Sequence, residues 1–300
     1  MGRRKNGLYL FYIGLAVVII LFFLRRVEGF QDKEKPKGVI LELIGGLGNQ
    51  LYIYSAGKVI EKALGVPILL TLDPGTVFTH SKTDYRNILF SDNHAINIGD
   101  DTYKDKIEFR IQNKFWDPWS PESIPSTDKY VYLPQQWYQH IPSIMSVVPE
   151  VSNSFIIKLQ EKYPNVSIDS NSAFIHIRRG DYTDEGNNAF LLDMDYYNKA
   201  INIIDQVDKI KIYYIFSNDI EWCKQQKWNT SKKFQYIDEP DELKTLYMMS
   251  QCKGGAIISN STFSTWGALL GPYRTSGKII YPSKWLYGAS TEFPEDWIRI

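Results

Sequence analysis

Residues 38–73 read GVILELIGGLGNQLYIYSAGKVIEKALGVPILLTLD, and this stretch decides the fold class. Its first part, Val39–Ile44, is almost wholly apolar, as expected of a strand buried in a parallel sheet. The glycine-rich turn GGLGNQ comes next and opens a predicted helix. That helix should end where Gly65 offers a favoured C′ residue and Pro67 forbids continuation. Ile68–Leu72 is a second apolar strand, so the stretch is a strand–helix–strand unit, which predicts an open parallel α/β sheet.

The second half of the chain alternates strands and helices in the same way. Residues 74–148 are rich in Trp, Tyr, Pro and Asp without a clear period, which predicts mostly loops with short elements. Pro149–Lys162 is a predicted helix, and two Rossmann-like domains, 39–165 and 166–300, are expected to face a cleft. The strands predicted after it are Ala173–Ile177, Ile210–Phe216, Ala256–Ser259 and Lys278–Tyr281, and the helices are Tyr196–Gln206, Glu239–Cys252 and Thr265–Leu270.

Polar sequences follow three strands of the second half, at the edge where open α/β sheets bind ligands. The first is HIRRGD, residues 176–181, and alternation along a strand places His176 and Arg178 on one face. Two adjacent arginines at a strand end predict an anion, and a diphosphate suits them because the guanidinium fork matches phosphate oxygens bidentately. The alternative is a structural ion pair with Asp181 or Asp184.

The other two polar sequences are Ser217-Asn218-Asp219 and Ser259-Asn260-Ser261-Thr262-Phe263-Ser264. A carboxylate at 219 suits the hydroxyls of a ribose or the N–H donors of guanine, but the same triplet is typical of a helix N-cap. The second sequence precedes a predicted helix, where free backbone N–H groups favour anions and hydroxyls add donors. N-capping by Ser261 or Thr262 is compatible with that role. Together the strand ends predict a pocket for a nucleotide diphosphate held without a metal.

The glycine-rich turn has two interpretations. Residues 46–51 approach the dinucleotide fingerprint G-x-G-x-x-G, and Asp73 lies about where a ribose-binding acid is expected. Leu51 replaces the third glycine, and an NAD-type oxidoreductase leaves the arginine pair unexplained. In an enzyme that uses a nucleotide sugar, Gly46, Gly48 and Asn49 would instead bring the backbone of the first domain close to the donor.

Composition excludes several classes of function. Lys+Arg and Asp+Glu are both 34, and this balance argues against a general nucleic-acid binder. Two cysteines, Cys223 and Cys252, exclude a disulfide framework and a cysteine-rich zinc site, while one disulfide or two free thiols stay open. The four histidines have no metal-ligand spacing, so no metal is expected.

Residues 8–24, LYLFYIGLAVVIILFFL, carry no charge. As a helix they would span about 26 Å, close to the ~27 Å hydrocarbon thickness of an endoplasmic reticulum bilayer. A cleaved signal peptide is the rival, but the following RRVEGF contains no small-x-small cleavage site. We therefore expect a cytoplasmic tail at 1–7, a signal-anchor at 8–24 and a stem at 25–38. The slight excess of basic charge before the anchor favours a luminal body, as in a type II Golgi membrane protein.

Six segments occur in one order along nearly all of residues 38–300: GGLGNQ (45–50), HIRRGDY (176–182), FSNDIEWCK (216–224), LYMMSQCK (246–253), SNSTFSTWGALL (259–270) and YPSKW (281–285). In these segments the chain resembles the α-1,2-fucosyltransferases of glycosyltransferase family 11. The resemblance implies a GT-B fold and inverting transfer of L-fucose from GDP-β-L-fucose to the 2-hydroxyl of a terminal galactose on a glycan. It further implies that no metal or other cofactor is required, that 166–300 binds GDP, and that 39–165 binds the acceptor.

The resemblance also implies roles for single residues. Arg178 would hold the donor pyrophosphate, and we expect it to stabilise the leaving group, because electrostatic preorganisation is commonly the largest catalytic term. The general base is left open between Asp73 and Asp84, each of which also suits a turn or a helix cap. The expected donor-site residues are His176, Arg178, Arg179, Asp181, Ser217, Asn218, Asp219, Ser259, Asn260, Ser261, Thr262, Phe263, Ser264, Gly46, Gly48 and Asn49.

Several questions stay open in the sequence. Trp116, Trp137 and Tyr138 suit stacking on acceptor sugars, but a core position is the favoured interpretation of each. A membrane-anchored protein that binds a nucleotide sugar without turnover is the main alternative function. The sequence leaves oligomeric state open, and it predicts glycans at the sequons of Asn165 and Asn229. The sequon at 260 is expected to stay bare because it lies in the predicted phosphate pocket.

Overall fold

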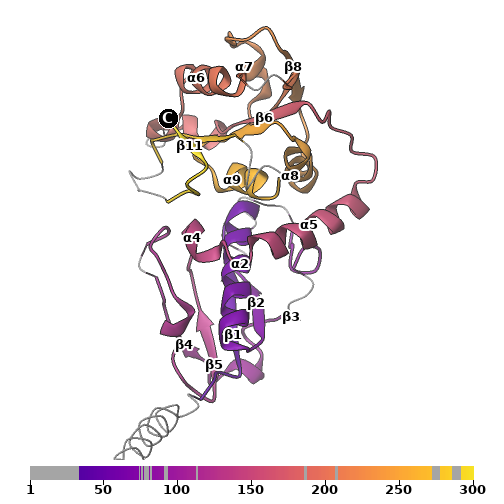
Figure 1. The fold of residues 1–300 in the computed structure, drawn as a ribbon. Helices are drawn as coiled ribbons and strands as arrows, with labels where there is room; N and C mark the ends of the chain where they lie inside the picture. Colours follow the sequence, from indigo (N-terminus) through magenta and orange to yellow (C-terminus); the bar gives the residue numbers. More distant parts are fainter. Residues whose placement is uncertain are drawn as a thin grey trace, which may run out of the picture.

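The chain folds into two α/β halves, each built on a parallel sheet (Figure 1). The predicted tail and anchor lie outside the described residues, as does the stem up to residue 33. Within the part that is described, no helix is long and apolar enough to cross a membrane. The computed structural model describes residues 34–73, 75, 77, 81, 83–90, 94–112, 114–185, 188–206, 209–271, 278–285 and 292–300.

The first half has a five-stranded sheet in the order β3-β2-β1-β5-β4. Its first strand–helix–strand unit confirms the prediction, with β1 and β2 paired in parallel. Helix α2 ends at Leu64, where Gly65 takes the left-handed conformation at φ 65°. The elements are β1 (Gly38–Leu43), α2 (Leu47–Leu64), β2 (Ile68–Leu72), β3 (His94–Ala95), η1 (Asp101–Tyr103), β4 (Ile107–Glu108), η2 (Pro121–Ser123), β5 (Tyr130–Leu133), α4 (Ile141–Ile144) and α5 (Val148–Lys162).

Residues 74–148 are mostly loops with short elements, as predicted, and one of these elements, β5, is a strand of the first sheet. It lies beside β1 near the centre of the sheet, with Val39 opposite Val131 and Leu41 opposite Leu133. The strand is only four residues long, YVYL, and it shows no alternation of polar and apolar residues. Its strand conformation comes from pairing with a segment about 90 residues earlier, which local sequence does not reveal.

The second half has a six-stranded parallel sheet in the order β11-β10-β9-β6-β7-β8. The predicted strands are present as β6, β7, β9 and β10, whereas β8 and β11 at the two edges were not predicted. Helix α9 begins three residues earlier than expected. The elements are β6 (Ser172–Ile177), η3 (Gly180–Thr183), η4 (Asn188–Phe190), α6 (Met194–Ile204), β7 (Ile212–Ser217), α7 (Ile220–Lys224), β8 (Lys233–Ile237), α8 (Glu242–Gln251), β9 (Gly255–Ile257), α9 (Thr262–Leu269), β10 (Ile279–Tyr281) and β11 (Ile298–Arg299).

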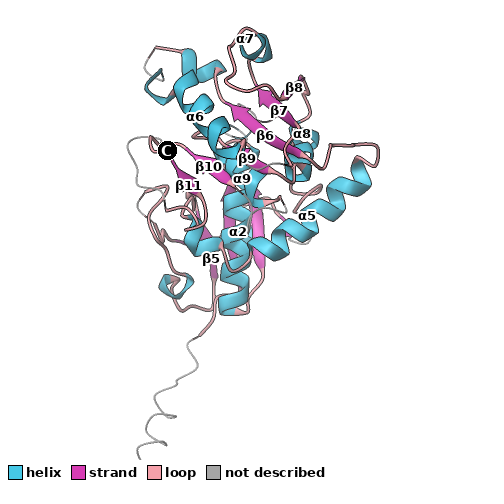
Figure 2. Ribbon diagram, turned by 45° about the horizontal axis from the view of Figure 1, so that its top comes forward, coloured by secondary structure: helices cyan, strands magenta, loops and turns pink. Residues whose placement is uncertain are grey.

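Helices α2 and α9 join the two halves (Figures 1 and 2). Tyr52 of α2 meets Trp266 of α9 edge to face, with ring centroids 5.5 Å apart, and one hydrophobic core runs through both. The hydroxyl of Ser152 on α5 also donates to the carbonyl of Leu269 at 3.2 Å. The α2–α9 contact brings together the loops that follow β1 and β9, so the carboxyl ends of the two sheets face each other.

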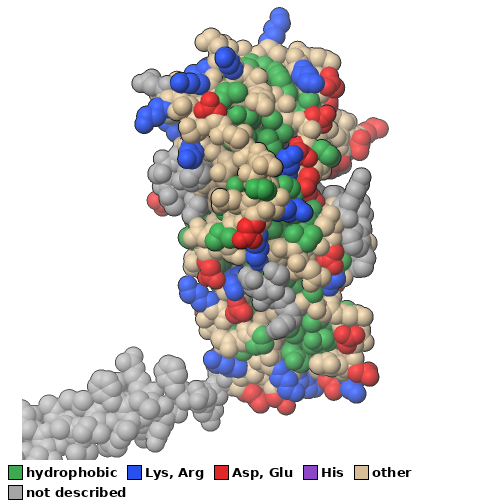
Figure 3. Space-filling model, turned by 90° about the vertical axis from the view of Figure 1, so that its right-hand side faces the viewer, with side chains coloured by type: hydrophobic (Ala, Val, Ile, Leu, Met, Phe, Trp, Pro, Cys, Tyr) green, Lys and Arg blue, Asp and Glu red, His purple; other side chains and the backbone are tan. Residues whose placement is uncertain are grey.

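A second contact lies near the link between the halves, where α5 ends and the chain crosses to β6. The Tyr163 hydroxyl donates to Asp241, the N-cap of α8, at 2.5 Å. The hydroxyls of Ser81 and Tyr85 both donate to Glu242, the first residue of that helix. The chain crosses from the first half to the second between Lys162, where α5 ends, and Ser172, where β6 begins. On the face seen in Figure 3, basic and acidic side chains are interspersed rather than gathered into one patch of a single sign.

Candidate functional site

In the second sheet, the direction in which successive strands are added reverses between β6 and β9. From β6 the chain proceeds outward through β7 to β8, whereas β9, β10 and β11 extend on the other side. Such a switch point leaves a crevice at the carboxyl ends of the two strands, where α/β proteins bind ligands. The structure brings two of the predicted segments together there, because His176 Nδ1 lies 2.8 Å from the Ser259 hydroxyl.

His176 is a neutral histidine in the wall of this crevice. Its side chain is buried, and burial together with the positive charge of Arg178 lowers its pKa to about 3. On the β9 side, the Ser264 hydroxyl donates to the carbonyls of Ser259 and Ser261, both at 3.0 Å, which closes the loop into a compact turn. The ring of Phe263 packs against the imidazole with centroids 5.8 Å apart.

Arg178 comes from the loop after β6, on the same side of the strand as His176. One third of its side chain is exposed, and Nη2 pairs with Asp181 at 2.7 Å. Its guanidinium also lies over the ring of Tyr182, at 5.6 Å from the centroid. The structural ion pair considered in the sequence analysis is therefore present, and one third of the Arg178 side chain is exposed to solvent at the same time. A role in phosphate binding stays a prediction.

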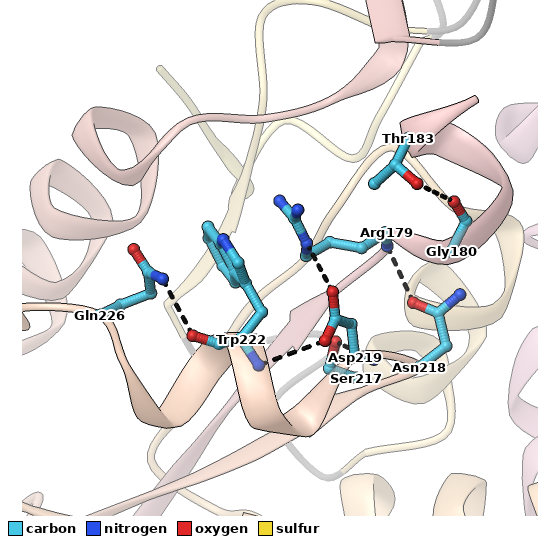
Figure 4. A network of polar contacts seen from close by, with 8 residues as sticks. All are labelled: Arg179, Gly180, Thr183, Ser217, Asn218, Asp219, Trp222 and Gln226. Atoms are coloured by element: carbon cyan, nitrogen blue, oxygen red, sulfur yellow. Dashed lines mark hydrogen bonds and ion pairs between the residues drawn. The ribbon is translucent and has the colours of Figure 1, made fainter. Parts of the chain in front are cut away.

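Arg179 is held on the other side of the loop, over α7 (Figure 4). Its Nε donates to Asp219 at 3.0 Å, and its guanidinium stacks on Trp222 at 4.0 Å from the ring centroid. Its backbone N–H donates to the Asn218 side chain at 2.8 Å. Gly180 has φ 46°, and a Cβ there would lie 2.3 Å from the Asn218 amide nitrogen, so the turn requires glycine.

The Ser217-Asn218-Asp219 triplet forms a helix N-cap, which was the alternative to a role in ligand binding. Asp219 accepts from the backbone of Trp222 at 3.2 Å, which caps α7, and its own N–H donates to the Ser217 hydroxyl at 3.0 Å. The same carboxylate holds Arg179, so it already has two partners. Trp222 was not among the predicted site residues. The sequence offered one signal for Trp222: it lies three residues after Asp219, in the first turn of the helix that Asp219 would cap.

The start of α9 meets the glycine-rich turn of the first half. The Thr262 hydroxyl donates to Asn49 at 2.9 Å, and Gly48 lies so close that a Cβ there would be 2.5 Å from the backbone nitrogen of Phe263. Gly46 precedes α2 as its N-cap residue. The first half therefore approaches the second through this turn, and the element it touches is the first turn of α9. An approach of this turn to the donor stays a prediction.

The third sequon lies inside the protein. Asn260 is buried, and its amide donates to the carbonyl of Phe190 at 2.8 Å. Tyr182, from the loop after β6, donates to the Asn260 carbonyl at 3.3 Å. By contrast, Asn165 and Asn229 are exposed. This difference in burial agrees with the expected pattern of glycan attachment, which stays a prediction.

Both candidates for the general base have local partners in the first half. Asp84 forms a bidentate pair with Arg86, including an Nη2–Oδ2 distance of 2.7 Å, and this hydrogen bonding lowers the pKa of the carboxyl. Asp73 accepts from the backbone of Gly75 at 3.0 Å, as in an ordinary turn. The geometry of Asp84 favours a structural role, and the identity of the base stays open.

The remaining predicted candidates divide by burial. Tyr138 is fully buried, whereas Trp116 and Trp137 are half-buried. Cys223 and Cys252 are free, buried thiols, and burial raises their pKa to about 11 and about 12, respectively. Among the described residues, no group of three or more His, Cys, Asp or Glu could hold a metal ion.

Comparisons with known proteins point to one class of enzyme. The model of the family described as glycosyl transferase family 11 matches residues 119–285, more than half of the chain. The O-antigen biosynthesis glycosyltransferase WbnK of Escherichia coli is 34% identical over 138 residues, which cover 44% of this chain and 45% of that protein. An α-1,2-colitosyltransferase of Escherichia coli is 33% identical over 144 residues, covering 44% of this chain and 48% of that protein. The matched region thus spans about half the length of these relatives.

The solved structures that resemble the chain include two glycosyltransferases of low sequence identity. The glycosyl transferase family 9 protein of Veillonella parvula has a TM-score of 0.48 at 10% identity, with 89% of this chain and 87% of that chain covered. The fucosyltransferase NodZ from Bradyrhizobium has a TM-score of 0.43 at 11% identity, with 79% and 94% covered.

Proposed function

Since the chain belongs to glycosyl transferase family 11, we propose that it transfers L-fucose from GDP-β-L-fucose to the 2-hydroxyl of a terminal galactose, with inversion to an α-linkage. We also propose that the two halves form a GT-B arrangement, with GDP bound by the second half and the acceptor glycan by the first. The crevice between β6 and β9 carries this proposal, because it combines an arginine with solvent access, the start of a helix and a switch point in the sheet.

The proposed chemistry needs stabilisation of the departing GDP. As the sugar–oxygen bond breaks, negative charge grows on the β-phosphate, and a preorganised cation nearby lowers the barrier. Arg178 is the residue proposed for this role, because its guanidinium can offer two parallel donors to phosphate oxygens. His176 next to it stays uncharged at neutral pH, so it can share hydrogen bonds without adding charge. The protein is proposed to work without a metal.

The relatives support the linkage more directly than the sugar. One of them is described as an α-1,2-colitosyltransferase, so a 1,2-linkage is shared with the proposal while the transferred sugar differs. A colitosyl donor is therefore the second candidate. Competition between GDP-fucose and GDP-colitose for the purified protein decides between them.

A further proposal concerns the N-terminal residues. Residues 8–24 are proposed to anchor the body to a membrane, on the basis of their uncharged run of 17 residues. Golgi residence and a luminal body stay predictions that rest on the same segment.

A nucleotide-sugar-binding protein without turnover is the rival function, and measured transfer would exclude it.

The test is transfer from labelled GDP-fucose to a β-galactoside in excess EDTA, with linkage analysis of the product. An α-1,2 product without added metal is expected. Activity that disappears in EDTA and returns with Mg²⁺ or Mn²⁺ would overturn the metal-free mechanism. Arg178→Lys should lower turnover by roughly 10²-fold or more, because a point ammonium cannot replace the bidentate fork. Arg86→Lys, which alters a more buried Arg–Asp pair in the first half, is the control and should keep its turnover.

A further inference from the structure

We propose that Trp137 forms the floor of an acceptor subsite that takes one pyranose ring, a β-galactoside, at the carboxyl edge of the first sheet. This inference rests on the proposed function and assigns the acceptor side of the same site. It starts from the segment Gln135–Gln139, which follows β5 and leads to α4. Because β5 is parallel to β1, this segment lies at the sheet edge that faces the second half.

The backbone on both sides of Trp137 is strained. Gln135 has φ 50° and Tyr138 has φ 53°, and in the part of the chain that is described these are the two non-glycine residues with positive φ. Such conformations are costly for residues with a Cβ, and they gather where a fold positions groups for a ligand. Here the two strained residues flank Gln136 and Trp137, which fixes the direction in which the indole leaves the chain.

Hydrogen bonds on both sides hold this strained segment in place. Gln136 accepts from the backbone N–H of Ile111 at 2.7 Å, and Gln112 in turn accepts from the backbone N–H of Tyr138 at 2.6 Å. The backbone N–H of Gln135 donates to Glu42 of β1 at 3.0 Å. Two backbone N–H groups and one side chain of the segment are thus held by separate elements, so little conformational entropy remains to be lost when a ligand binds there.

Trp137 is the exception among buried neighbours. Gln136, Tyr138 and Gln139 are buried, whereas the indole between them is only half-buried. One side of the indole rests on Phe115, with centroids 5.0 Å apart, and its edge lies against Gly45, where a Cβ would be 2.9 Å from Cζ3. Gly45 has φ 69°, which also favours glycine. The indole is therefore fixed by its contacts while part of it faces solvent.

The position of Trp137 relative to the crevice follows from a short chain of contacts. Gln139 donates to Asn49 at 3.1 Å, and the same Asn49 oxygen accepts from Thr262, the first residue of α9, at 2.9 Å. Two hydrogen bonds thus connect the Trp137 segment to the helix start that is proposed to lie at the donor phosphates. A sugar bound on the indole would be a close neighbour of the donor.

The chemistry of the indole selects the class of ligand. A partly exposed, rigid aromatic ring offers a large apolar surface at little cost in side-chain entropy. In galactose, the axial 4-hydroxyl leaves the C–H groups at C3, C4 and C5 together on one face of the ring, and this apolar face suits stacking on tryptophan. The hydroxyls on the ring edge then remain available to polar groups and to the donor sugar.

The experiment compares Trp137→Ala and Trp137→Phe with a control, Trp228→Ala. Trp228 is also half-buried, but it lies in the second half, where its indole N–H donates to the Tyr236 hydroxyl at 3.1 Å. Trp137→Ala should raise the KM for methyl β-D-galactopyranoside at least about 10-fold, the scale of losing one stacked ring, while the KM for GDP-fucose changes less than about 2-fold. Trp137→Phe should stay within about 3-fold of the wild type, and the control should leave both constants unchanged.

Saturation-transfer NMR of methyl β-D-galactopyranoside in the presence of GDP gives a readout that does not need turnover. Loss of the sugar signal in Trp137→Ala but not in Trp228→Ala would support the subsite even if the transferred sugar proved not to be fucose. Unchanged acceptor binding in a folded Trp137→Ala protein would overturn the inference and leave the proposed transfer intact. A fall in donor and acceptor binding by equal factors would also overturn it, because it would show a purely structural role.

Discussion

Gly48→Ala tests how the two halves pack against each other by adding a single methyl group between α2 and α9. Gly48 lies in the first turn of α2 and packs on the first turn of α9. An added Cβ would lie 2.5 Å from the backbone nitrogen of Phe263, 2.6 Å from the carbonyl carbon of Thr262 and 2.8 Å from the hydroxyl of Thr262. Two of these three atoms belong to the backbone of a helix, so no side-chain rotation can relieve the overlap.

The size of the effect follows from these distances. Ordinary contact begins near 3.4 Å, so the two helices must separate by about 0.9 Å for the methyl group to fit. Overpacking of this kind typically costs about 1–3 kcal/mol of unfolding free energy. A displacement of about 1 Å between reacting groups also costs roughly 10²-fold in rate. We therefore expect Gly48→Ala to be somewhat destabilised and to lose transfer activity by one to two orders of magnitude.

The assay combines urea unfolding with steady-state transfer from GDP-fucose. Gly57→Ala is the matched control, because it makes the same change in the same helix, and its new Cβ would meet mainly the Cδ1 atom of Ile68 at 2.5 Å. That atom is the end of a flexible side chain, so Gly57→Ala should keep near-normal transfer. If Gly48→Ala retains both the stability and the turnover of the wild type, α2 and α9 do not meet in this way.

Three further predictions rest on other contacts. Trp222→Leu removes the ring on which the Arg179 guanidinium stacks, and it should lower the free energy of unfolding in urea by about 0.5–2 kcal/mol. A variant as stable as the wild type would show that this stacking contributes nothing. The unfolded state takes up a proton on His176 near pH 6.5 and the folded state only near pH 3, so stability should fall with acidification between them. The slope should reach about 1.4 kcal/mol per pH unit, and His176→Asn should flatten it. In secretory cells, mass spectrometry should find glycans at Asn165 and Asn229 but not at buried Asn260, and a glycan at the last in active protein would contradict the site.

The parts of the fold that were predicted correctly have strong local signals. β2 has the predicted bounds, because an apolar run lies between Pro67 and the polar Asp73. α2 ends where Gly65 was expected to end it. α9 shows the limit of such signals, because its first turn contains Thr262 and Phe263, which are not strong helix formers. α9 begins at Thr262 instead of the predicted Thr265, and the residues of this additional turn contact Gly48, which is distant in the sequence.

The elements that were missed are defined by partners distant in the sequence. β5 pairs with β1, and β8 pairs with β7 as an edge strand in which Lys233 and Gln235 are exposed. The site shows the same limit. The three strand ends were found because polar residues after apolar runs are visible in the sequence, whereas the stacking of Trp222 on Arg179 needs the turn of α7 to be known. Strain at Gln135 has no sequence signal either, since it depends on hydrogen bonds to separate segments.

Alternation along β6 separates two arginines that the sequence presents as a pair. Ile177 packs into the cluster that contains Tyr197 and Cys223, and both of these groups feel the charge of Arg179. Arg179 therefore leaves the strand on the α6–α7 side, while Arg178 leaves it beside His176 in the crevice.

The same conservative change should consequently have opposite effects at the two positions. Arg179→Lys loses the Nε–Asp219 bond and planar stacking, so it should cost about 1–2 kcal/mol of stability with turnover reduced less than about 5-fold. Arg178→Lys should keep stability within about 0.5 kcal/mol and lose turnover, because its ion pair with Asp181 is partly exposed. Paired unfolding and kinetic measurements decide the matter. If Arg179→Lys is the variant that loses turnover at unchanged stability, the phosphate-binding arginine is on the α7 side and the crevice between β6 and β9 is not the donor site.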